Sequence, residues 1–323
     1  MLWSCCGVPW FGVVRSAIIE DNVPQQQHVL DAASPRRREN PVTQHPSIAV
    51  TGATGNVGGS VTRALSEAGT ALRLVVRSRG RAPVLPGVTV AETSYGDHDA
   101  AVAALAGVDT LFMVSASESA DRLAQHRTFV DAAVRAGVQH IVYTSFLNAA
   151  PDATFTLARD HWATEEHIRA SGVQFTFLRD SFYIDFLPSL AGSDGVIRGP
   201  AGDGAVGAVA RADVARVAST VLIDPASHRG ETYDLTGRES LAFDEVARII
   251  TETSGRTVTF HNETIDEAYE SRKAYGAPDW QLDAWVSTYT AIAAGELATV
   301  TDTVEAITGR PPMTLRDYIV GSA

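Results

Sequence analysis

Residues 47–60 read SIAVTGATGNVGGS, in which a short β-branched run enters a glycine-spaced turn and leaves in a segment with helical spacing. Gly52, Gly55 and Gly58 form a GxxGxxG pattern between a predicted strand and a predicted helix, the context in which such a pattern binds a nucleotide. There, one glycine allows a tight turn, one lets a diphosphate approach the backbone, and one lets the helix pack on the strand. Glycines that merely turn the chain are the alternative, which this context disfavours.

The glycine pattern also predicts which groups contact the cofactor. A diphosphate would rest against the backbone amides of residues 54–57, at the positive end of the helix dipole. We therefore expect a dinucleotide to contact Gly52, Thr54, Gly55, Asn56 and Val57.

Strand-like and helix-like segments alternate after the glycine pattern. Strands are expected at IAVT, ALRLVVR, VTVAET, DTLFMVS, HIVYTS and QFTFLR, with helices between them that end near residues 68, 106, 136 and 170. This alternation predicts an α/β fold, a Rossmann-type doubly wound parallel sheet covered on both faces. We assign residues 47–180 to an NAD(P)-binding core, and 181–323 to the remaining core elements and a smaller C-terminal α/β lobe for substrate. An aromatic-rich helical stretch within 260–310 is expected to form a cap.

Composition narrows the class of protein. With 323 residues, 45% of them hydrophobic, the chain can bury a sizeable core. Residues 1–46 lack periodicity and are rich in Pro, Gln and Arg, which predicts a disordered extension. Basic and acidic residues balance there, so the net charge of −12 belongs to the rest of the chain. An acidic body is a poor partner for nucleic acid.

The positions of the cysteines and the hydropathy of the sequence indicate whether a metal site or a membrane segment is expected. Cys5 and Cys6 are the only cysteines and both lie in the extension, so the body has neither a disulfide framework nor a Cys-ligated metal site. No metal is expected. Apolar runs of transmembrane length are absent from the sequence, which predicts a cytoplasmic protein without membrane contact. A homodimer is left open.

The end of the second strand, LVVRSRGR, indicates which dinucleotide binds. The acidic residue that would bind a ribose 2′-hydroxyl is replaced by Arg77, and Ser78, Arg79 and Arg81 add donors, which favours the 2′-phosphate of NADPH. An ordinary solvated loop is the alternative. Asp97, after the third strand, is expected to accept a hydrogen bond from the adenine amino group, to cap the next helix, or both.

The catalytic pattern of short-chain dehydrogenases is incomplete. Ser145 fits its serine, but Leu157 stands at the position of the tyrosine acid and His161 at that of the lysine. A literal YxxxK at Tyr269 and Lys273 lies far along the chain in the expected cap, and we interpret it as a chance match.

Several side chains near the ends of the later strands remain as candidates for chemistry. His161 is expected to hydrogen-bond a ribose or substrate oxygen or to relay a proton, oriented by Glu165 one turn later. A satisfied helix histidine is the equal alternative, and Tyr143, which faces the same side of its strand as Ser145, is equally a core residue. The expected catalytic residues are His161, Tyr143, Ser145 and Tyr183. Ser115 and His161 are expected to contact the cofactor, and Phe146, Trp162, Asp180, Phe182 and Tyr183 the substrate.

An ordered series of motifs carries a family resemblance. TGATGNVGG, YGD, IVYTSF, LARDHWATE, LRDSFY, GPAGDGAVGAVARADVA and TGRPP follow one another across about residues 47–320. Together they resemble the NmrA-like atypical short-chain dehydrogenases, and within them the NAD(P)H:quinone oxidoreductases of type 2. The resemblance implies NADPH as hydride donor, a quinone between the two lobes, and a histidine at position 161 in place of the Tyr–Lys pair. Asp180 stands where asparagine is expected, and a carboxylate cannot donate as an amide does unless it is protonated. Arg211 and Asp213, in RAD, are expected to tie the lobes and cap a helix.

The expected reaction is hydride transfer from NADPH to a small quinone. The product anion is delocalised, so positioning can supply most of the rate without a tyrosine acid. The proton would come from water or through His161, Tyr143 or Tyr183. Two alternatives stay open: a non-enzymatic NAD(P)-binding sensor that reports redox state to a protein partner, and a reductase or epimerase of another small molecule.

Overall fold

The computed structural model describes residues 47–322. The expected disordered extension, residues 1–46, lies outside this range.

A seven-stranded parallel sheet, in the order β3-β2-β1-β4-β5-β6-β9, forms the centre of the molecule. Its inner strands β1, β4 and β5 are buried along their whole length, as expected when helices cover both faces. The strand order reverses at β1, which pairs with both β2 and β4, and such a reversal opens a crevice at the carboxyl ends of the strands. The predicted doubly wound sheet is therefore confirmed. The strands are β1 (Ile48–Thr51), β2 (Leu72–Val76), β3 (Val88–Glu92), β4 (Thr110–Met113), β5 (His140–Phe146), β6 (Gln174–Asp180) and β9 (Glu231–Leu235).

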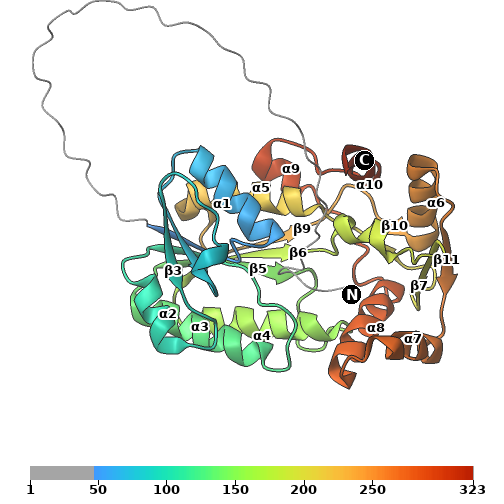
Figure 1. The fold of residues 1–323 in the computed structure, drawn as a ribbon, viewed down its shortest axis with the longest axis horizontal. Coiled ribbons are helices and arrows are strands. Elements are labelled where there is room, and N and C mark those ends of the chain that lie inside the picture. Colours follow the sequence, from blue (N-terminus) through green and yellow to red (C-terminus); the bar gives the residue numbers. More distant parts are fainter. Residues whose placement is uncertain (1–46, 323) are drawn as a thin grey trace, which may run out of the picture.

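Two groups of helices cover this sheet (Figure 1). On one face α1 packs on α5 and α5 on α9, over a core that includes Val61, Leu74 and Val217. On the other face α2, α3 and α4 pack side by side, and Phe129 and Met113 belong to the core beneath them. The helices are α1 (Asn56–Glu67), α2 (His98–Leu105), α3 (Arg122–Ala136), α4 (Thr156–Ala170), α5 (Arg211–Ile223) and α9 (Thr303–Thr308).

A smaller lobe lies beside the carboxyl ends of β5 and β6 (Figure 1). It contains two two-stranded sheets, β7 with β11 and β8 with β10, and its apolar core around Phe243 and Tyr289 continues to Phe146 of β5 and Ala158 of α4. The chain enters this lobe through the 3-10 segment η2 (Ile184–Leu190). The remaining strands and α-helices are β7 (Val196–Gly199), β8 (Ala205–Val206), β10 (Leu241–Ala242), α6 (Phe243–Ser254), β11 (Thr259–Asn262), α7 (Ile265–Arg272), α8 (Asp279–Ala293) and α10 (Leu315–Ser322).

The segments after residue 180 serve both parts of the molecule. Strand β9 and helices α5 and α9 return to the central sheet, whereas α8, in the aromatic-rich stretch expected to form a cap, packs against α4. The division at residue 180 stays a prediction. Within residues 47–322 no helix combines the length and apolarity needed to cross a membrane.

Candidate functional site

The glycine loop brings α1 close to the end of β1. Gly52 has φ +63°, and a Cβ atom at Gly58 would lie 2.5 Å from the Gly52 carbonyl oxygen, so both positions require glycine. Helix α1 begins without a side-chain cap and has no acidic residue in its first turn. Its first amides and the positive end of its dipole are therefore available to an anion.

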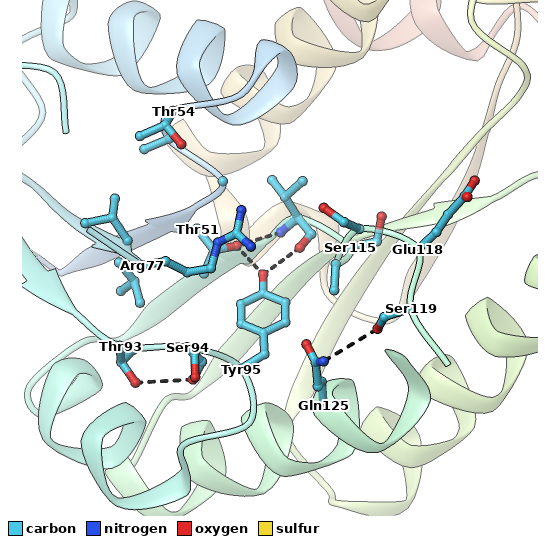
Figure 2. A pocket seen from close by; sticks show the side chains of 17 residues that line it. Thr51, Thr54, Arg77, Thr93, Ser94, Tyr95, Ser115, Glu118, Ser119 and Gln125 are labelled. Carbon is cyan, nitrogen blue, oxygen red and sulfur yellow. Dashed lines mark hydrogen bonds between the residues drawn. The ribbon is translucent and has the colours of Figure 1, made fainter. Parts of the chain in front are cut away.

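A cavity of about 240 Å³ lies beside this loop, where the strand order reverses. Figure 2 shows Arg77 reaching toward it from the end of β2, with Ser115 and Glu118 on the other side. The Tyr95 hydroxyl lies 2.6 Å from Thr51 Oγ1 and 2.5 Å from the Val114 carbonyl oxygen, and this holds the ring in the cavity wall. Sequence reasoning missed Tyr95, because only the fold brings it against β1 and β4.

Arg77 is exposed and lines both this cavity and an open depression beside it, which Asp97 also lines. Asp97 is the N-cap of α2, and its Oδ1 accepts from the Ala100 amide at 3.1 Å. The capping interpretation of Asp97 is therefore confirmed, and its contact with adenine stays a prediction. Arg79 and Arg81 are exposed and line neither space.

Two smaller spaces adjoin the first cavity, and all three share Ser115. One of about 20 Å³ lies at the start of α1 and is also lined by Thr144 and Arg211. The other, of about 40 Å³, lies at the end of β5. We call the three together the cleft. The 40 Å³ space is lined by Ser115, Ala116, Ser117, Glu118, Arg122, Ser145, Phe146, Phe155, Leu157, His161 and Tyr183.

His161 is buried at the wall of this last space, with both ring nitrogens engaged. Its Nε2 lies 2.9 Å from an Arg122 guanidinium nitrogen and its Nδ1 lies 3.0 Å from the Tyr143 hydroxyl. A guanidinium can only donate, so Nε2 accepts and Nδ1 carries the proton. Burial, together with the positive charge of Arg122, holds the pKa of His161 well below its usual range. The imidazole is therefore neutral at physiological pH and is not a ready source of protons.

The expectation that Glu165 orients His161 is wrong. The buried Glu165 carboxylate accepts from Ser145 Oγ at 2.6 Å and from two Arg179 nitrogens at 2.8 and 2.7 Å. Arg122 and Tyr143 orient the imidazole instead. Ser145 lines the cleft, but its hydroxyl proton is directed toward Glu165.

Tyr143 lies behind His161 and is fully buried, and burial raises its pKa well above the usual range. It lines none of the three spaces of the cleft. His126, beside it, accepts from the Ala116 amide at 2.8 Å, and Arg122 Nε donates to the Ala116 carbonyl at 3.0 Å. The buried side chains of Arg122, His126, Tyr143 and His161 thus connect the loop after β4 to α3 and α4. Sequence reasoning missed His126 and Arg122 as site residues.

Tyr183 lines two of the three spaces, and its hydroxyl donates to Asp180 Oδ2 at 2.7 Å. Asp180 is 1% exposed, and its Oδ1 has no hydrogen-bond partner within residues 47–322. Burial raises the pKa of Asp180 to about 8, and the bond from Tyr183 opposes this only in part. The side chain is therefore mostly a neutral carboxylic acid at neutral pH. Asp180 lines none of the three spaces, and it is connected to the cleft by its hydrogen bond with Tyr183.

The expected aromatic wall is partly assembled. Phe146 and Tyr183 line the cleft, whereas Phe182 is buried in the core of the smaller lobe and Trp162 lines none of the three spaces. Phe155, which sequence reasoning missed, completes the wall from the residue before α4.

The YxxxK pair, interpreted as a chance match, lies outside the cleft. The Tyr269 hydroxyl donates to Asp283 at 2.7 Å, and Lys273 forms a surface ion pair with Glu270 at 2.5 Å. Neither residue lines a space of the cleft.

Comparison with known proteins identifies the family of this chain. Residues 44–275 match the NmrA-like family. The chain belongs to the NmrA-like family. This NmrA-like protein is 35% identical over 279 residues to quinone oxidoreductase 2 of Escherichia coli, covering 84% of this chain and 97% of that protein.

Solved structures of two reductases superpose closely on this NmrA-like protein. The NADPH-dependent quinone oxidoreductase of Escherichia coli complexed with NADPH has a TM-score of 0.78 and 34% identity, covering 85% of this chain and 99% of that one. The triphenylmethane reductase of Citrobacter sp. complexed with NADP(H) has a TM-score of 0.77 and 33% identity, covering 86% of this chain and 100% of that one. The predicted family resemblance is therefore confirmed.

Proposed function

We propose that this protein is an NADPH-dependent oxidoreductase that transfers a hydride to a small quinone. The observation that carries the proposal is the cleft itself, which runs from Arg77, past the uncapped start of α1, to the space lined by Phe155 and Leu157. Arg77 at one end suits a 2′-phosphate, and the other end, where aromatic and aliphatic side chains lie beside Arg122 and His161, suits a flat acceptor next to the nicotinamide. The similarity to a quinone oxidoreductase and to a dye reductase supports the same class of acceptor.

The residues of the cleft fit the parts of NADPH in order. The amides at the start of α1 would hold the diphosphate, and Arg77 the 2′-phosphate. Ser115 and Thr144, at the ends of β4 and β5, lie where the second ribose would bind. When bound, NADPH supplies the hydride.

Arg122 and Tyr183 would serve the acceptor. Arg122 lines this end of the cleft and is held by the Ala116 carbonyl, by His161 and by an ion pair with Asp160 at 3.4 Å. Its guanidinium would lie beside the quinone oxygen that gains negative charge. For proton transfer the hydrogen bond between Tyr183 and Asp180 would reverse: the Tyr183 hydroxyl gives its proton to the product oxygen, and the acid form of Asp180 gives its proton to the Tyr183 oxygen, leaving a carboxylate. Phe146, Phe155 and Leu157 would lie against the flat ring of the acceptor.

The test is oxidation of NADPH by the purified protein with benzoquinone and naphthoquinone acceptors, followed by loss of the reduced nicotinamide absorbance. We expect turnover that depends on the quinone, and slower turnover when NADH replaces NADPH. Tight binding of NADPH and NADP without turnover of any quinone would overturn this proposal and favour the redox-sensor alternative.

A further inference from the structure

Arg211, the first residue of α5, holds its guanidinium at the smallest space of the cleft. This space of about 20 Å³ is shared with the glycine loop and the first turn of α1, from Gly55 to Gly58. The guanidinium carbon lies 4.1 Å from the centre of the Phe186 ring and 5.3 Å from that of Tyr183. Two aromatic rings therefore fix a cation beside the loop.

The charge of Arg211 has no partner in the part of the chain that the structure describes. Its Nε is buried without a hydrogen-bond acceptor, and no ion pair forms there with any carboxylate. The nearby Asp185 is directed to the main chain instead, where its Oδ2 accepts from the Arg211 amide at 3.0 Å. Arg216, one turn later, pairs with Asp213 at 2.8 Å. A cation that is held in place yet unpaired, beside backbone amides free to bind an anion, indicates a negatively charged ligand.

We propose that Arg211 binds the diphosphate of the dinucleotide, together with the first-turn amides of α1. This deepens the proposed function, because it rests on a dinucleotide lying in the same cleft. A helix start contributes roughly half a positive charge, whereas a diphosphate carries two negative charges. The guanidinium supplies the missing charge and two parallel donors that match phosphate oxygens. Arg211 therefore binds the diphosphate, and Arg77 binds the 2′-phosphate.

A role confined to packing is the competing explanation, because Arg211 also covers Phe186 and Tyr183. Arg211→Met separates the two, since it keeps an unbranched stem over the rings and removes the charge. Arg211→Lys keeps a charge without the planar fork. Arg135→Gln, at an exposed arginine in the last turn of α3, is the matched control for loss of one positive charge.

The experiment is calorimetric titration of each variant with NADPH, NADH and adenosine 2′-monophosphate, which has a 2′-phosphate but no diphosphate. We expect Arg211→Met to weaken NADPH and NADH by the same factor, about 10-fold or more, and to leave the monophosphate unchanged. Arg211→Lys should recover part of the loss, and Arg135→Gln should change nothing. If Arg211→Met does not fold by circular dichroism, Arg211→Gln removes the same charge and takes its place.

Two results would overturn the inference: unchanged affinity for both dinucleotides in the charge-removing variant, or equal weakening of all three ligands, which indicates a packing role. Failure of the proposed function looks different, because quinone turnover would be absent while NADPH still bound through Arg211. Wild-type protein that bound neither dinucleotide would overturn both.

Discussion

At the scale of single residues, Asp180 predicts how stability depends on pH. Burial raises its pKa from an ordinary 3.8 to about 8, so the folded chain holds this proton more tightly than the unfolded chain. Its contribution to stability is complete below about pH 4 and is lost as the pH rises through about 8. Relative to Asp180→Asn, the wild type should therefore lose unfolding free energy across this window, at most about 1.4 kcal/mol per pH unit.

The measurement for Asp180 is urea denaturation of both proteins at several pH values between about 5 and 9. The difference between the two curves isolates Asp180, because all other groups titrate in both. A constant difference across this range would mean that the folded protein holds Asp180 ionised.

Arg77 is expected to select the dinucleotide. Arg77→Ala removes the guanidinium beside the predicted 2′-phosphate position, so the dissociation constant should rise about 10-fold more for NADPH than for NADH, as expected for a lost charged hydrogen bond. Fluorescence titration of both coenzymes gives the ratio. Arg135→Ala, at an exposed arginine in α3 outside the cleft, should leave it unchanged. An unaltered ratio in Arg77→Ala would remove Arg77 as the 2′-phosphate ligand.

At the scale of elements, the contact of α1 with β1 sets the position of the amides proposed to bind the diphosphate. A Cβ atom at Gly58 would meet the Gly52 and Thr51 carbonyl oxygens at 2.5 and 2.6 Å, which are backbone atoms that cannot rotate away. Gly58→Ala should therefore move the start of α1, cost about 1–3 kcal/mol of stability, and weaken NADPH and NADH together.

Thermal denaturation and coenzyme titration test the Gly58 prediction. Gly321→Ala in α10, where a Cβ atom meets nothing within 4 Å, is the control and should leave both properties unchanged. Wild-type affinity in Gly58→Ala would show that the diphosphate does not depend on the position of α1.

At the scale of the whole molecule, α8 of the smaller lobe reaches the loop after β4. Glu118, which lines two spaces of the cleft, accepts from Gln281 Nε2 at 2.8 Å and from Trp285 Nε1 at 3.3 Å. Gln281→Ala should loosen this loop beside the acceptor and raise the KM for quinone by about 2- to 5-fold, the effect of one lost hydrogen bond. The dissociation constant of NADPH should change less.

Steady-state kinetics with a varied quinone, together with NADPH titration, test this connection between the lobes. Gln139→Ala, at an exposed glutamine before β5, should alter neither value. A change confined to NADPH affinity would show that the loop serves the coenzyme and not the acceptor.

Local patterns in the sequence were sufficient to predict the architecture and the half of the cleft formed by the glycine loop and Arg77. Alternating apolar runs predict the parallel sheet, because each strand and helix is a local element whose periodicity shows which face it buries. Gly52, Gly58 and Arg77 were predicted for the same reason, since a tight turn, a close helix contact and a strand-end cation depend on near neighbours in the chain.

The other half of the cleft was decided only by tertiary packing. Glu165 lies one turn from His161, yet it binds Ser145 and Arg179, because β5 and β6 bring those partners to the same face of α4. Arg122 reaches His161 from another helix, and Arg211 reaches the glycine loop from a segment more distant still. Spacing along a chain limits which neighbours can meet on one element, but contacts between elements depend on how the layers pack, and these contacts set the charge and protonation of the cleft around His161.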